Sequence, residues 1–72
     1  MHRAMMYITF THNEKSYAVE CETEMDASLI HMSAVGVFDK VRVNFSGRVG
    51  KDVVKLSEDE FSHMADEIIY NE

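Results

Sequence analysis

Polar and apolar residues alternate strictly over residues 40–45, which read Lys-Val-Arg-Val-Asn-Phe. Successive side chains of an extended strand point to opposite faces of a sheet, so this alternation predicts a strand with one buried face. Val41, Val43 and Phe45 form the row that we expect to be buried. The opposite, polar row consists of Lys40, Arg42 and Asn44.

Residues 46–50 interrupt the alternation with Gly47 and Gly50, which can adopt the positive φ angles of tight turns. Residues 51–56 then resume an extended pattern around two adjacent valines. Two extended segments around a glycine-containing loop are typical of a β-hairpin. We therefore predict that the two segments pair with each other.

The apolar period changes from that of a strand to that of a helix at Ser57. Ser57 and Glu60 have the spacing of a capping box, in which each side chain bonds the backbone N–H of the other residue. The apolar residues that follow recur at helical spacing, which predicts an amphipathic helix lying across the sheet. These residues are Phe61, Met64, Ala65 and Ile68.

The N-terminal part of the chain predicts a first hairpin. Residues 1–5 have no periodic pattern, and we expect them to be frayed. Residues 6–12 and 16–23 alternate like strands, with a polar turn at residues 13–15 between them. Met6, Ile8 and Phe10 lie in one row of the first strand, and Tyr17, Val19 and Cys21 lie in the matching row of the second.

Residues 24–35 leave two alternatives open, a short helix or an irregular connection. For a helix, Thr23 or Asp26 would cap the N-terminus, and Gly36 would end it in the left-handed conformation. Met25, Leu29 and Met32 would then line one side. Methionines on such a side can form an adaptable contact surface, but we expect them to pack into the core.

These elements predict an α+β fold in the order ββ(α)ββα. The sheet would have about four antiparallel strands from two β-hairpins, and the C-terminal helix would pack on one face. A chain of 72 residues corresponds to one small domain, residues 1–72. Domains of this size bury a lower share of their surface than larger domains do, which makes a homodimer an option.

Composition indicates a soluble, folded protein. Hydrophobic residues make up 46% of the chain, and the formal net charge of −6 opposes general affinity for nucleic acids. The single cysteine rules out an internal disulfide, and no apolar run is long enough for a signal sequence or a membrane span. We therefore expect a cytoplasmic protein without membrane contact.

Five of the seven lysines and arginines lie within residues 40–55. They are Lys40, Arg42, Arg48, Lys51 and Lys55. In the register that pairs Val43 with Val54, Arg42 lies directly opposite Lys55, which is unfavourable for two like charges. Either Glu20 and Glu22 on an adjacent strand neutralise this basic hairpin, or the hairpin receives an acidic partner or a nucleic acid.

The predicted C-terminal helix carries a second candidate surface, the acidic residues Glu58, Asp59, Asp66 and Glu67. Carboxylates in the first turn are stabilised by the helix dipole, but those near the C-terminus are not. Asp66 and Glu67 therefore either keep the domain soluble or bind a basic surface of a partner.

The sequence offers no sign of catalysis or of a bound cofactor. Residues 47–51 lack the glycine spacing and the serine or threonine of a phosphate-binding loop. The four histidines and Cys21 have no zinc-ligand spacing, so we expect no metal. No nucleophile pattern or pair of catalytic carboxylates is found, so we expect no enzymatic activity.

A non-enzymatic module that binds a protein partner is the interpretation we favour. The short, acidic, proline-free chain is similar in composition to many small regulators and inhibitors encoded by bacteria, phages and mobile elements. Some of these block nucleic-acid machinery, and the resemblance implies that this chain acts by docking on a macromolecule. A nucleic-acid-binding domain and a self-assembling structural protein are the two alternatives.

Overall fold

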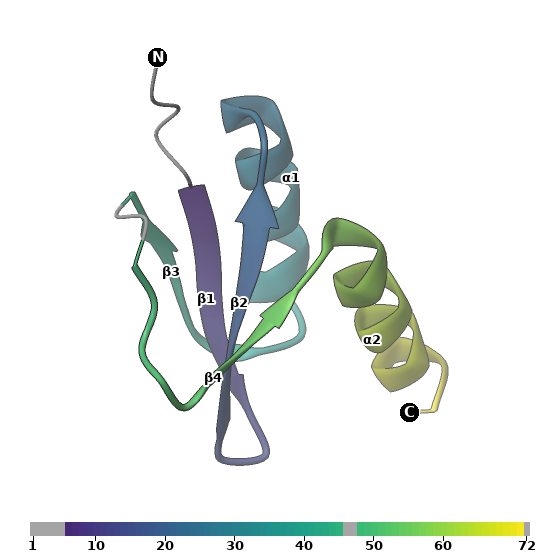
Figure 1. The fold of residues 1–72 in the computed structure, drawn as a ribbon. Coiled ribbons are helices and arrows are strands. Elements are labelled where there is room, and N and C mark those ends of the chain that lie inside the picture. Colours follow the sequence, from purple (N-terminus) through teal and green to yellow (C-terminus); the bar gives the residue numbers. More distant parts are fainter. Residues whose placement is uncertain (1–5, 46–47, 72) are drawn as a thin grey trace.

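The computed structural model describes residues 6–45 and 48–71. The predictions for residues 1–5 and for Gly47 lie outside the described residues. Two helices and a four-stranded sheet confirm the α+β class and the order of elements (Figure 1). The elements are β1 (Met6–His12), β2 (Lys15–Cys21), α1 (Glu24–Val35), β3 (Asp39–Asn44), β4 (Val53–Leu56) and α2 (Glu58–Tyr70).

The first predicted hairpin is confirmed. β1 and β2 pair antiparallel, with Met6 opposite Cys21 and Phe10 opposite Tyr17. Asn13 and Glu14 have φ angles of 51° and 66°. Positive φ at both central residues belongs to the two-residue turns whose twist matches that of the flanking strands. The second strand therefore begins at Lys15, one residue earlier than expected.

The second predicted hairpin is wrong. The strand order is β3-β1-β2-β4, so β3 and β4 occupy opposite edges of the sheet. β4 pairs with β2 in parallel, which makes the sheet mixed rather than purely antiparallel. Val43 accordingly pairs with Ile8, and Val54 pairs with Tyr17. A parallel pair needs a long crossover connection, which here includes residues 45–52 as well as β3 and α1.

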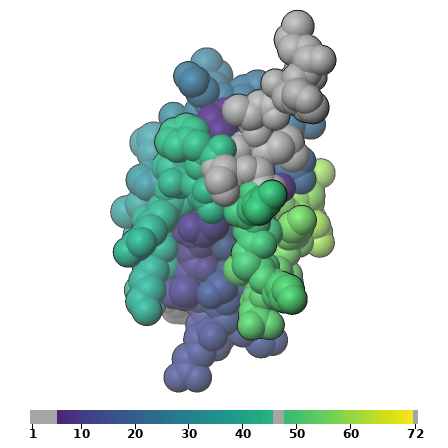
Figure 2. All heavy atoms as spheres, turned by 60° about the vertical axis from the view of Figure 1, so that its left-hand side comes forward, coloured from purple at the N-terminus to yellow at the C-terminus, as the bar shows by residue number. Residues whose placement is uncertain are grey.

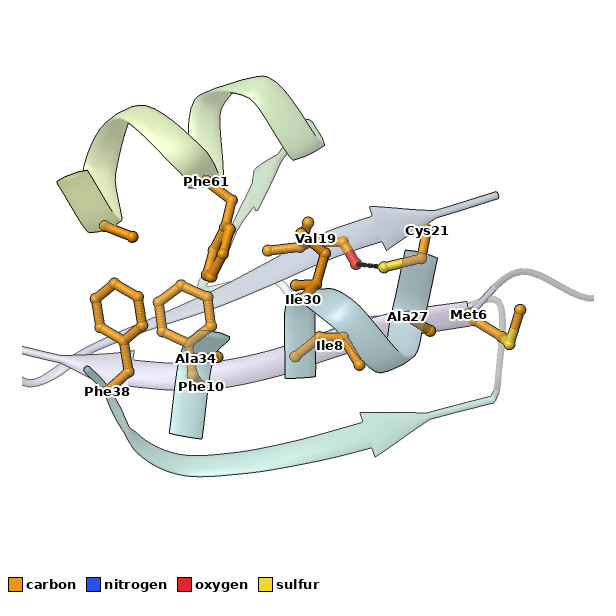
Figure 3. Packing of buried hydrophobic residues seen from close by; sticks show 11 residues of the cluster. Met6, Ile8, Phe10, Val19, Cys21, Ala27, Ile30, Ala34, Phe38 and Phe61 are labelled. Atoms are coloured by element: carbon orange, nitrogen blue, oxygen red, sulfur yellow. Dashed lines mark hydrogen bonds between the residues drawn. The ribbon is translucent and has the colours of Figure 1, made fainter. Parts of the chain in front are cut away.

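Both helices cover one face of the sheet, and the connection between β3 and β4 runs on the other side (Figure 1). The helix-covered face carries the core, where the Phe10 ring stacks on Phe38 with centroids 4.1 Å apart. Phe61 of α2 meets Phe10 edge-on at 5.7 Å (Figure 3). Aromatic pairs of this kind join a strand, a loop and a helix into one cluster.

The helix ends follow the sequence in part. The Thr23 hydroxyl accepts a hydrogen bond from the Asp26 N–H at 3.0 Å, which confirms one of the two predicted caps for α1. Gly36 has a φ of −80°, so the predicted left-handed ending is wrong. The Ala34 carbonyl instead accepts bonds from the N–H groups of Val37 and Phe38, which leads the chain directly into the core.

The C-terminal helix α2 begins as predicted. The Ser57 hydroxyl accepts from the Glu60 N–H at 3.1 Å, and the Glu60 carboxylate accepts from the Ser57 N–H at 2.9 Å. Phe61 and Ala65 are buried, and Met64 and Ile68 pack against them, which confirms the apolar stripe. The capping box thus fixes the start of the helix, and the stripe fixes the side that faces the sheet.

Candidate binding surfaces

The structure divides the predicted acidic helix surface into two parts. Glu58 and Asp59 in the first turn of α2 line an open pocket together with Glu20 and Glu22. Asp66 and Glu67 lie farther along α2 with exposed side chains. Glu58 and Asp59 therefore line a pocket that does not include Asp66 and Glu67.

The first part of the acidic surface also involves α1. Partial burial raises the pKa of Glu58, and the nearby carboxylates of Asp26 and Glu22 raise it further. A side-chain hydrogen bond between Glu58 and Asp26 contributes in the same direction. This pair links the first turns of the two helices. No group of side chains within the described ranges has the arrangement of a metal site.

The basic residues share a face of the sheet but not a hairpin. Lys40 and Arg42 come from β3, Arg48 and Lys51 from the connection that follows, and Lys55 from β4. Arg42 pairs with Thr9 of β1, and Lys55 pairs with Ala18 of β2. The predicted opposition of Arg42 and Lys55 is therefore wrong. β2, which carries Glu20, is adjacent to β4 but not to β3.

A groove opens on this face between β3 and the connection to β4. Figure 2 looks onto it, with β1 visible between β3 and the segment that leads to β4. Its volume is about 280 Å³. Lys40 and Asn44 line one wall, and Arg48 lies among the residues of the other. Thr9, Thr11 and Ser16 contribute hydroxyl groups to the lining.

The backbone at Lys40 is unusual for a lysine. Its φ angle is 53°, in the left-handed region that residues with a Cβ atom rarely adopt. The strand register shifts here, because Thr9 pairs with Arg42 while Thr11 pairs with Asp39. Bulges of this kind redirect a side chain and disrupt pairing along an edge strand. Regular pairing of β3 with β1 is confined to the end of the strand at Arg42, Val43 and Asn44.

A second groove lies on the helix side, between the β3 edge and α1. Val43 and Phe45 line it from the sheet, and Ala27, His31 and Met32 line it from the helix. Met6, Glu24 and Ser28 complete its lining. Its volume is about 540 Å³. The groove runs beside the regular half of β3, an edge strand with no neighbouring strand on its outer side within residues 6–45 and 48–71.

The outer side of α1 is also apolar. Met25 and Met32 are 74% and 72% exposed, so the expectation that they pack into the core is wrong. Leu29 and Val35 are exposed on the same helix, whereas Ala27, Ile30 and Ala34 are buried. Alanines at the buried positions let the helix approach the sheet closely, which leaves the larger side chains outside.

Sequence reasoning missed the groove between α1 and β3. Val43 and Phe45 were expected to be buried within a hairpin, but they are 41% and 67% exposed. Met32 is the available signal, because it shares the apolar spacing of Met25 and Leu29 on α1 and lines this groove. The spacing alone predicts one apolar side of the helix, but it does not show whether that side packs against the sheet or faces solvent.

Cys21 behaves as a core residue. Its side chain is buried, and its thiol donates a hydrogen bond to the Val19 carbonyl at 3.6 Å. Burial raises the pKa of Cys21 to about 11, with further contributions from the carboxylates of Glu58 and Asp26. The thiolate, which is the reactive form, is therefore scarce at neutral pH.

Comparison with protein-family models, with curated proteins and with solved structures finds no match for this chain. None of the helices in the described part of the chain has the length and apolar character needed to cross a bilayer. The candidate surfaces therefore stand on their geometry and chemistry alone.

Proposed function

We propose that this protein is a non-enzymatic docking module that binds an extended segment of a partner protein along the edge of β3. The observation that carries the proposal is the apolar groove between α1 and the exposed edge of that strand. Peptides that add a strand to a sheet gain main-chain hydrogen bonds from the edge and specificity from adjacent pockets. In this protein the edge of β3 and the apolar groove lie next to each other.

The side chains of β3 define the chemistry of the partner segment. Val43 lies on the helix side and Arg42 on the opposite side, where Lys40 also lies. A strand added at this edge alternates in the same way, so its apolar side chains enter the groove and the others lie beside Arg42. The matching segment therefore alternates apolar residues with acidic ones.

The same charges disfavour a second copy of the chain at this edge. An antiparallel pair of β3 strands would bring the basic side chains of both copies onto one face of the joined sheet. Like charges on neighbouring strands destabilise such a pair. A heterologous partner with acidic residues avoids this repulsion, and partner binding is therefore favoured over self-assembly at β3.

A synthetic peptide of alternating valine and glutamate, labelled with fluorescein, tests the proposal by fluorescence anisotropy. Controls are a scrambled peptide of the same composition and a peptide of alternating valine and lysine. We expect binding of the valine–glutamate peptide only. Equal binding of the scrambled peptide would show that charge or hydrophobicity alone is responsible and would overturn the strand-addition mechanism.

Two matched variants locate the binding site. Met32→Glu places a carboxylate in the groove. It should weaken peptide binding by about tenfold or more, because the bound peptide would cover that charge and remove its solvation. Tyr70→Glu makes a similar change at a residue of α2 that is 83% exposed. We expect it to leave the affinity unchanged. An equal loss in both variants would move the site away from the groove.

A further inference from the structure

The groove on the opposite face of the sheet has a different chemistry. Its lining residues combine Lys40 and Arg48 with the hydroxyl-bearing residues Thr9, Thr11 and Ser16. Its described lining residues include no carboxylate, whereas the neighbouring pocket combines Thr11, Ser16 and Lys40 with Glu14 and Asp39. Hydroxyl, lysine and arginine side chains are the groups with which proteins bind phosphate oxygens. This groove shares no lining residue with the groove between α1 and β3.

Lys40 is the residue on which this groove depends most. Its left-handed backbone costs free energy that glycine or asparagine would largely avoid. Strained residues of this kind are concentrated at functional sites, where the side chain has a role that offsets the cost. No ion pair holds Lys40 among the residues that the structure describes. A bound anion would supply a countercharge on the groove side of Lys40.

The other lining groups already have defined surroundings. The Thr11 hydroxyl donates to the Asp39 carbonyl at 3.3 Å, which fixes the strand beside Lys40. Asn44 and Arg48 take part in interactions of their own. The half-buried side chains of Thr9 and Ser16 are therefore the hydroxyl groups that we assign to the ligand, together with the Lys40 ammonium group.

We propose that the groove lined by Lys40, Thr9 and Ser16 binds the phosphoryl group of a small phosphorylated molecule. Its volume of about 280 Å³ suits a compact ligand. The net charge of −6 disfavours a long polyanion, because segments outside the groove would be repelled. This groove shares no lining residue with the groove that receives the apolar side chains of the peptide, so either proposal can fail without the other.

Titrations with inorganic phosphate and inorganic pyrophosphate test the proposal. The readout is the NMR amide signals of the intact chain, with sodium chloride at equal ionic strength as the control. We expect saturable shifts at Thr9, Ser16 and Lys40 with phosphate or pyrophosphate and not with chloride. Shifts that chloride reproduces would overturn the proposal, because they would report ionic strength alone.

Lys40→Gly distinguishes a binding role from a structural one. The glycine relieves the backbone strain, so the midpoint of thermal unfolding should rise, while affinity for pyrophosphate should fall by about tenfold or more. The control Lys15→Ala removes an exposed cation from the start of β2 and should leave affinity unchanged. Unchanged affinity in Lys40→Gly, or an equal loss in Lys15→Ala, would overturn the assignment of Lys40.

A single-stranded oligonucleotide is the last probe. We expect it to bind no more tightly than pyrophosphate, with a weak dependence on salt. Tighter binding that falls steeply with salt would indicate contacts with several phosphates and would overturn the assignment to a small molecule in favour of a nucleic acid.

Discussion

Arg42 and Lys55 lie at opposite ends of one row across the sheet, separated by Thr9 and Ala18. Arg42 pairs with Thr9, Thr9 with Ala18, and Ala18 with Lys55. Three strand spacings put the two basic residues about 14 Å apart along the row. This distance exceeds the screening length at physiological salt, so the two charges should not influence each other measurably.

A double-mutant cycle checks this relationship. Arg42→Ala and Lys55→Ala should change the free energy of unfolding additively, within about 0.5 kcal/mol, because the sites are remote. Chemical denaturation of the wild type, both single variants and the double variant gives the coupling energy. A larger coupling would indicate that β3 and β4 are neighbours and would contradict the strand order.

Two phenylalanines test the position of the core. Phe38→Ala removes a ring stacked 4.1 Å from Phe10 and should destabilise the protein by about 3–5 kcal/mol. Phe45→Ala makes the same chemical change at a side chain that is 67% exposed, and its effect should stay within about 0.5 kcal/mol. Denaturant unfolding measures both. Similar losses in the two variants would refute the assignment of Phe38 to the core.

Glu58 and Glu60 should affect stability with opposite signs. The pKa of Glu58 is higher in the folded protein than its ordinary value of 4.5. Ionisation of Glu58 therefore destabilises the fold above the folded pKa, and well below 4.5 the carboxyl is protonated in both states and has no such effect. Glu58→Gln should therefore raise the midpoint of thermal unfolding near neutral pH, and the gain should disappear in acid.

Glu60 provides the matched control for that experiment. Its hydrogen bonds from Ser57 lower its pKa, so its stabilising contribution is present above 4.5 and is lost as the pH falls through the folded pKa. Glu60→Gln should lower the midpoint near neutral pH. If both substitutions shift the midpoint in the same direction, the two carboxylates do not have the environments described here.

Cys21 should resist alkylation in the folded protein. With a pKa of about 11 and a buried side chain, its thiol is almost fully protonated at neutral pH. Labelling with iodoacetamide, followed by mass spectrometry, should be slow in native buffer and fast in denaturant. Rapid labelling of the native protein at neutral pH would show that the thiol is accessible and ionised.

The parts of the fold that depend on local signals were predictable. The capping box of Ser57 and Glu60 involves residues three apart, and its hydrogen bonds form as expected. The alternation in β3 correctly separated Val43, on the helix side, from Arg42, on the open face. Both features are fixed by backbone geometry within a single element.

The pairing of strands was not predictable in the same way. Val43 and Val54 face the same side whether their strands are neighbours or lie at opposite edges, so alternation does not distinguish the two arrangements. The connection at residues 45–52 resembles a hairpin loop in composition but carries the chain to the opposite edge of the sheet. The candidate grooves depend on this topology, so the pattern along the chain does not show which residues line them together.

A strand added at the edge of β3 beside α1 would change the exchange of the backbone amides there. Amide hydrogen exchange of residues 41–45, with and without the alternating valine–glutamate peptide, tests this strand addition most directly. An added strand would bond the outward-facing amides, so these alternate positions should become strongly protected while the amides of β4, at the other edge, stay unchanged. Binding of the peptide without new protection in β3, or with protection in β4 instead, would show that the peptide does not add a strand at the β3 edge.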